Sequence, residues 1–217
     1  MDIQSQERIW QFAGRNTKKL NELSDYFHYP ELISTILIGR GIDTPAKIQQ
    51  YIKPSPLNFY SPFYFKDMVK AIDRIEFAVK ERQGILIFGD KDADGVTATA
   101  ILYKFLQRLE ANVVYRVPEG AENYGITKDV IGWAAMNDFS LIITVDCGIT
   151  SIPEIEYARS VGIDFIITDH HEARDKIPDA YAVINPKIVH DSYPFAFLSG
   201  ASVAFKLVCG IAEDDAQ

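Results

Sequence analysis

The fold is decided by one short stretch near the middle of the chain, Ile85-Leu86-Ile87-Phe88-Gly89-Asp90-Lys91-Asp92-Ala93-Asp94-Gly95-Val96. Its apolar first part is typical of a strand that is buried on both faces, as in a parallel sheet. A polar turn with three aspartates follows, and apolar residues at helical spacing then continue to about residue 110. The stretch therefore predicts a buried strand, an acidic turn and a covering helix.

The same alternation continues toward the C-terminus. Strands are expected at 85–89, 112–117, 141–145, 164–168 and 181–184, and helices at 96–110, 127–136, 153–161 and 199–210. Strands that alternate with helices are typical of a parallel sheet covered on both sides. We therefore expect an α/β fold with a mostly parallel sheet and helices on both faces.

Residues 1–65 differ in character and are expected to form a small helical N-terminal segment. Pro30–Arg40 has a helical pattern, and Asp43-Thr44-Pro45 opens another short helix with proline in its first turn. Lys53-Pro54-Ser55-Pro56 interrupts that pattern.

The main domain is expected at 66–210, beginning with a helix at Met68–Arg82. Residues 211–217 are expected to be a polar tail. A chain end so close behind an apolar helix favours a chain that was cut short.

Composition indicates a folded cytoplasmic protein. The 217 residues are 47% hydrophobic, which is enough for a substantial core. No apolar run approaches the roughly 20 residues that span a bilayer, so no membrane partner is expected. The start, Met1–Glu7, lacks the features of a signal peptide, and two cysteines provide no disulfide framework.

The formal charge of −8 is unusual for a protein that handles nucleic acid, where a basic face is common. Residues 1–80 carry 11 Lys/Arg against 9 Asp/Glu, whereas residues 81–217 carry 11 against 21. Two bound divalent cations would offset about four of these negative charges and attract phosphate. The charge therefore does not exclude a polyanionic partner.

Acids and imidazoles follow three of the expected strands. Asp90, Asp92 and Asp94 follow the first, Asp146 follows the strand at 141–145, and Asp169, His170 and His171 follow the strand at 164–168. The carboxyl ends of parallel strands meet at one edge of a sheet. Oxygen and imidazole ligands suit Mn²⁺ or Mg²⁺, and a two-metal hydrolase could use such a set to clamp a phosphate.

Each motif also has a structural interpretation. The aspartate turn resembles half of a calcium loop, but Ile101 stands where such a loop needs glutamate. Asp94 could cap the following helix, and Asp146 could belong to an ordinary turn. Adjacent histidines are harder to explain structurally, because buried imidazoles need hydrogen bonds or a metal.

Taken together, the motifs resemble those of RecJ-like single-strand-specific nucleases in the DHH phosphoesterase superfamily. The matching segments, in order, are Gly89–Ala100, Thr144–Ile149, Thr168–His171, Ile184–Pro186 and Leu198–Phe205. The resemblance runs from about Glu31 to Leu207.

The resemblance implies a role for each motif residue. Asp92, Asp94, Asp146 and His170 would be metal ligands, with Asp90 close to the same site. His171 would contact the scissile phosphate or protonate the leaving oxygen, and Asp169 would orient an imidazole.

The activity implied by the resemblance is metal-dependent phosphodiester hydrolysis, as a 5′ to 3′ exonuclease on single-stranded DNA in repair or recombination. Single-strand-binding or repair proteins would be further partners. The alternatives are a superfamily phosphoesterase for short oligonucleotides or cyclic dinucleotides, and a non-catalytic scaffold.

The sequence departs from the family pattern in four places. Phe88 stands where some members have a histidine ligand, and Pro118–Gly125 lacks the usual arginine and first glycine. The fourth motif, an aspartate at a later strand end, is not found. The second domain and the strand-holding module of RecJ-like proteins are not found either, so we expect a chain that is weakly active or inactive alone.

Overall fold

The computed structural model describes residues 17–120, 122, 124–189 and 193–214. The chain divides into two compact units, Met1–Phe59 and Tyr60–Gln217. The expectations for Met1–Glu7 and for residues 215–217 lie outside the described residues. No helix in the described part of the chain is long and apolar enough to cross a membrane.

The first unit is helical in its described part, as its sequence predicts. It contains α1 (Thr17–Phe27), α2 (Glu31–Gly39), α3 (Pro45–Ile52) and a 3₁₀ turn, η1 (Pro56–Asn58). The hydroxyl of Thr44 accepts a hydrogen bond from the amide of Lys47 and caps α3, while Pro45 occupies its first turn. Leu23, Leu37 and Ile48 form a small core.

The second unit is an α/β structure. Its strands are β1 (Gly84–Gly89), β2 (Val113–Arg116), β3 (Phe139–Val145), β4 (Asp164–Thr168) and β5 (Ala182–Ile184). Its helices are η2 (Pro62–Tyr64), α4 (Met68–Lys80), α5 (Ala93–Arg108), α6 (Lys128–Met136), α7 (Ile152–Ser160) and α8 (Gly200–Asp214).

The strands pair in the order β2-β1-β3-β4-β5, and every pair is parallel. Because β3 lies between β1 and β4, the ends of these three strands are neighbours. Val145 at the end of β3 is in register with Gly89 of β1 on one side and Thr168 of β4 on the other. The register therefore brings the three polar turns that follow these strands to one edge.

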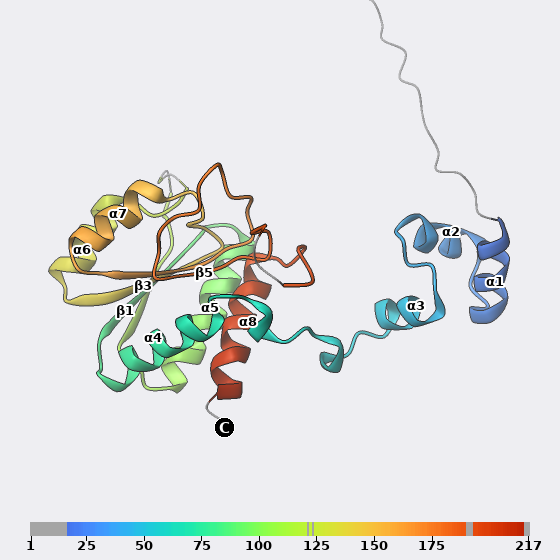
Figure 1. Cartoon of the computed structure of the whole chain (residues 1–217), viewed down its shortest axis with the longest axis horizontal. Helices are drawn as coiled ribbons and strands as arrows, with labels where there is room; N and C mark the ends of the chain where they lie inside the picture. The colour runs from blue at the N-terminus through green and yellow to red at the C-terminus, as the bar shows by residue number, and fades with distance from the viewer. Residues whose placement is uncertain (1–16, 121, 123, 190–192, 215–217) are drawn as a thin grey trace, which may run out of the picture. The chain divides into compact units, whose positions relative to one another are not determined.

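Helices cover both faces of the sheet (Figure 1). One apolar cluster joins the strands to α4, α5 and α8, and the other joins them to α6 and α7. The central strand β1 is buried along its whole length. The predicted α/β class, with a parallel sheet between two helical layers, is confirmed.

Two helix boundaries differ from the sequence-based prediction by more than two residues. Helix α5 begins at Ala93 rather than residue 96, because the carboxylate of Asp92 caps it by accepting hydrogen bonds from the amides of Asp94 and Gly95. The capping residue is thus Asp92 and not Asp94. Helix α8 continues to Asp214 rather than ending at residue 210, because Ile211 is fully buried against the core.

The start of α5 packs directly against the end of β1. A Cβ atom on Gly95 would lie 2.5 Å from the carbonyl oxygen of Asp90, closer than atoms can approach. Gly95 therefore allows the helix to begin within contact distance of the acidic turn.

We predict that Gly95→Ala destabilises the protein by about 1–3 kcal/mol, because the added methyl group overpacks the junction. Gly132→Ala in α6 is the matched control, since its Cβ would meet only the Tyr157 hydroxyl at an ordinary 3.4 Å. This control should gain up to about 1 kcal/mol from alanine's helix propensity. Urea unfolding of both variants measures the difference, and equal effects would contradict the packing argument.

Candidate metal centre

The turn after β1 places Asp90 and Asp92 at the carboxyl edge of the sheet. Asp90 is buried, and its Oδ1 accepts a hydrogen bond from the amide of Lys91 at 2.7 Å. Asp92 is exposed, and its Oδ1 caps α5 with two hydrogen bonds of 2.9 Å. In both residues the hydrogen bonds of the turn fix one oxygen, which sets the orientation of the whole carboxylate.

Asp94 joins the start of α5 to the start of α8. Its Oδ2 accepts a hydrogen bond from the amide of Gly200 at 2.7 Å, and its Oδ1 accepts one from the amide of Ala201 at 2.8 Å. A negative charge is stabilised at a helix N-terminus by the unpaired amides and the helix dipole. The N-terminus of α8 is thereby held against the acidic turn, 106 residues away along the chain.

Asp146 lies at the centre of the site, directly after β3. Its backbone has a φ of 60°, a left-handed conformation that aspartate tolerates better than most residues. The side chain is almost fully buried. Burial, followed by the negative charges of Asp94 and Asp92, raises the pKa of Asp146 to about 7.

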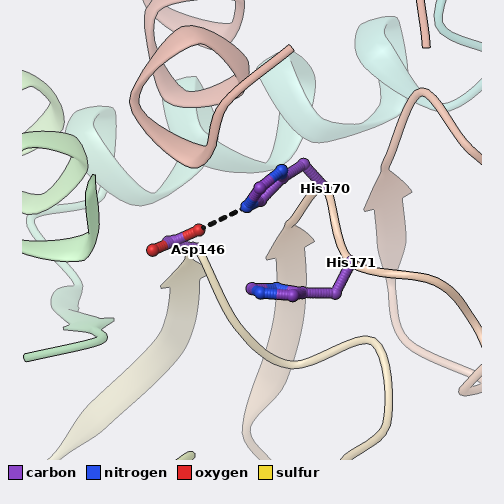
Figure 2. Close-up of side chains that lie close together, drawn as sticks. All are labelled: Asp146, His170 and His171. Carbon is purple, nitrogen blue, oxygen red and sulfur yellow. Dashed lines mark ion pairs between the residues drawn. The ribbon is translucent and has the colours of Figure 1, made fainter. Parts of the chain in front are cut away.

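One oxygen of Asp146 lacks a hydrogen bond. Oδ1 is buried and accepts none from the described residues. Nε2 of His170 lies 3.1 Å away, close enough for an ion pair but without hydrogen-bond geometry (Figure 2). A buried carboxylate oxygen without a donor is costly, and a cation would compensate for it.

The turn after β4 orients the two histidines through Asp169, which is fully buried. Asp169 Oδ1 accepts hydrogen bonds from the amides of His170 and His171, and Oδ2 accepts one from the amide of Ile149. The same Oδ1 lies 2.7 Å from Nδ1 of His171. We assign the proton to Nδ1, which leaves the lone pair of Nε2 free to contact a cation or a substrate atom.

The predicted residues form two groups that share Asp146. Asp90, Asp92 and Asp146 make up one, and Asp146, His170 and His171 the other. In each group one donor atom per residue lies within 4.8 Å of the others. Figure 2 shows Asp146 at a strand end facing the imidazoles of the next strand. Among the described residues, two adjacent groups that could each hold a cation thus share one carboxylate.

Two of the predicted site residues lie outside these groups. Asp169 makes three backbone hydrogen bonds and faces His171 rather than the shared carboxylate. Asp94 has its Oδ2 3.7 Å from Nε2 of His170, but both its oxygens are hydrogen-bonded to α8. Because each carboxylate oxygen has two lone pairs, these bonds leave Asp94 able to accept a further partner.

The structure adds neighbours to which sequence reasoning assigned no role. The hydroxyl of Tyr124 lies 3.4 Å from Nδ1 of His171 and 3.4 Å from the carbonyl oxygen of Asp146. The buried side chain of Asn185 donates a hydrogen bond to the carbonyl oxygen of His171. Both residues fall in segments that the motif comparison singled out, but their contacts span 14 to 47 residues of sequence, which no local pattern shows.

Phe88 is buried in the apolar cluster beneath α6 and α7. This position therefore contributes packing rather than a ligand. The potential ligand atoms are mostly carboxylate oxygens, with two imidazoles, and therefore fit divalent cations that prefer oxygen and nitrogen ligands. The neighbouring thiol of Cys147 is buried, and burial raises its pKa, so it is poorly suited to bind a metal as a thiolate.

The crowding of carboxylates around Asp146 predicts a trade-off between stability and metal binding. We expect Asp146→Asn to raise the stability of the metal-free protein at pH 8 by about 0.5–2 kcal/mol, since it removes a buried negative charge beside two others. The wild type should gain about 2.7 kcal/mol when Mn²⁺ is 100-fold above its Kd. The variant should gain much less, because it loses the shared ligand. Thermal unfolding with EDTA and with Mn²⁺ measures both effects.

Asp138→Asn is the matched control, because Asp138 is exposed and has the same φ of 60° outside the site. It should behave as the wild type in both conditions. A variant Asp146→Asn that is less stable than the wild type in EDTA, or equally stabilised by Mn²⁺, would contradict the electrostatic account.

Comparison with curated proteins finds similar sequences among bacterial nucleases. The chain is 39% identical to the single-stranded-DNA-specific exonuclease RecJ of Bacillus subtilis over 199 residues, covering 91% of this chain and 25% of that protein. It is 34% identical to the protein of the same name from Escherichia coli, covering 84% of this chain and 31% of that protein. The chain thus spans about a quarter to a third of the length of these relatives.

Solved structures show the same fold. RecJ of Thermus thermophilus in complex with Mn²⁺ superposes with a TM-score of 0.74 at 26% identity, covering 93% of this chain and 28% of that one. An exonuclease RecJ bound to manganese superposes with a TM-score of 0.63 at 33% identity, covering 69% and 38%. The family described as "DHH family, N-terminal domain" matches residues 84–217. These residues contain the whole of the site, and the chain belongs to the DHH family.

Proposed function

We propose that the chain is the metal-binding catalytic part of a phosphodiesterase that degrades single-stranded DNA from its 5′ end, in repair or recombination. The observation that carries the proposal is the buried, unpaired oxygen of Asp146, shared by two groups of potential ligands. Relatives of 34% and 39% identity that are named single-stranded-DNA-specific exonucleases support the substrate class.

Asp90, Asp92 and Asp146 would hold one Mn²⁺ or Mg²⁺ ion, and Asp146 with His170 would hold a second. Asp94, which lies in the first turn of α5 and is held by the amides of α8, would complete the site. When bound, the cations would stabilise charge on the phosphate and lower the pKa of an attacking water. The bonds that fix one oxygen of Asp90 and of Asp92 orient the other oxygen before any cation arrives.

His171 would act on the substrate itself. Its Nδ1 donates to Asp169, and its side chain is about half exposed, so Nε2 can reach a phosphate oxygen or the leaving oxygen. The hydrogen bond to Asp169 orients the ring, so that Nε2 could exchange a proton with that oxygen during hydrolysis. Asp169 would position His171 without touching the substrate.

The unit that begins at Tyr60 would be the catalytic part, and the helical first unit would be an accessory. Single-strand-binding or repair proteins stay predicted partners. A cytoplasmic location is consistent with a DNA substrate and with the free thiols of Cys147 and Cys209.

The substrate is tested with the complete gene product and Mn²⁺. We expect single strands labelled at the 5′ end to lose their label first as mononucleotides, while strands labelled at the 3′ end shorten gradually. EDTA and Asp146→Asn should abolish release, and Asp138→Asn should not. If the protein hydrolyses only short oligonucleotides or cyclic dinucleotides, the alternative of a phosphoesterase for small substrates would be favoured. Absence of both hydrolysis and Mn²⁺ binding would favour a scaffold.

Asp169→Asn tests the positioning role. Loss of a group that orients an active-site histidine typically costs about 10–100-fold in activity, and we expect a fall in kcat of that size. The Kd for Mn²⁺ measured by calorimetry should change little, because Asp169 lies outside the two groups of potential ligands that share Asp146.

Asp175→Asn removes an exposed charge from the segment after the histidines and serves as the control. An Asp169→Asn protein with full activity would refute the proposed role. One that loses Mn²⁺ binding in parallel with activity would show that Asp169 supports the ligands instead.

A further inference from the structure

A groove of about 290 Å³ lies on the outer side of the sheet edge, between α5 and β2. Its lining residues come from one face of α5 and from the end of β2: Val96, Thr99, Ala100, Tyr103, Lys104, Tyr115 and Val117. The volume is near the lower limit of small-ligand sites, which is about 300 Å³. The groove therefore has room for one flat ring system rather than for a packed helix.

The groove begins beside the candidate metal centre. Val96 follows Asp94 by two residues in α5, which is about 3 Å along a helix axis, and Tyr103 follows it by nine, which is about 14 Å. The other wall comes from Tyr115 in β2 and from Val117, which directly follows this strand. The groove thus begins near the candidate ligand carboxylates and extends away from them over about the length of one or two nucleotides.

Aromatic rings form much of the groove wall. The rings of Tyr103 and Tyr115 meet edge to face, with centroids 4.8 Å apart. Tyr115 is 55% exposed and Val96 is 47% exposed, although both are large and apolar in most of their surface. Exposed apolar side chains grouped in one concave patch are typical of a binding site.

The groove also carries a positive charge, in an otherwise acidic neighbourhood. Lys104 lines it, and the salt bridges among the described residues of this unit do not involve its ammonium group. An aromatic wall with a nearby cation is the combination that holds a base and its phosphate in single-strand-binding proteins. This complements a nucleotide better than it complements an apolar peptide.

We propose that the groove between α5 and β2 binds one nucleobase of the single strand, stacked on Tyr115, while an adjacent phosphate reaches the metal centre. The inference rests on the proposed function and adds to it a substrate subsite that is separate from the potential metal ligands. Because every base offers an aromatic face, the subsite would hold the strand without reading its sequence. Tyr115 would thus contact the substrate directly, without taking part in the hydrolysis.

The proposal is tested by strand binding with the complete gene product in Mn²⁺. The probes are fluorescent thymidine oligonucleotides with a 5′-phosphate and hydrolysis-resistant phosphorothioate linkages, either intact or lacking one base at a chosen position. We expect Tyr115→Ala to weaken binding of the intact strand about five-fold or more, the usual cost of losing one stacked base. One base-free position near the 5′ end should weaken wild-type binding similarly, without weakening the variant further.

Two variants serve as controls. Tyr115→Phe keeps the ring and should bind as the wild type does. Phe77→Ala removes an aromatic ring of similar exposure from α4, outside the groove, and should also bind normally. Thermal unfolding should show that all three variants are folded.

Unchanged binding by Tyr115→Ala would overturn the subsite while strand hydrolysis by the wild type upheld the proposed function. Equal effects of the missing base on variant and wild type would also overturn the subsite. A Tyr115→Ala protein that binds strands normally but changes its mass in light scattering would show a contact between copies of the chain instead. A wild type that neither binds nor cleaves single strands would refute the proposed function together with the subsite.

Discussion

The parallel pairing of β3 between β1 and β4 is the constraint on which the rest of the site depends. Each of these strands ends in a turn that carries ligand candidates, and their aligned register brings the turns together. The central turn is that of Asp146, which consequently belongs to both ligand groups. A shift of one residue in either pairing would turn the apolar side chains of a buried strand to the opposite face. The core thus fixes the site's geometry.

This geometry has an electrostatic cost, which the fold partly offsets with backbone amides. The N-terminus of α5 stabilises Asp92, that of α8 stabilises Asp94, and the turn after β4 supplies donors to Asp169. Asp146 has no comparable donor for its buried oxygen among the described residues. Backbone amides thus compensate the charges of Asp92, Asp94 and Asp169 but not that of Asp146. A cation would therefore have most effect at Asp146.

The sequence predicts the sheet well because its strands are short apolar runs between polar turns. It also predicts which residues gather at the edge, because only the strand order and direction matter for that. It does not predict contacts that depend on packing between distant segments. The bonds from Asp94 to α8, the approach of Tyr124 to His171 and the groove beside Tyr115 are of this kind. Sequence reasoning misplaces the start of α5 because it interprets the capping residue, Asp92, only as a ligand.

The double use of Asp92 bears on which ions the site can select. One of its oxygens is committed to holding the first turn of α5, so its carboxylate cannot swing to present both oxygens to a large cation. Calcium usually takes six to eight oxygen atoms from a flexible, often bidentate set, whereas Mg²⁺ demands a compact octahedron. By restraining Asp92 in this way, the helix cap would disfavour the bidentate contacts that calcium often makes, and would leave single-oxygen contacts to a smaller cation such as Mg²⁺ unaffected.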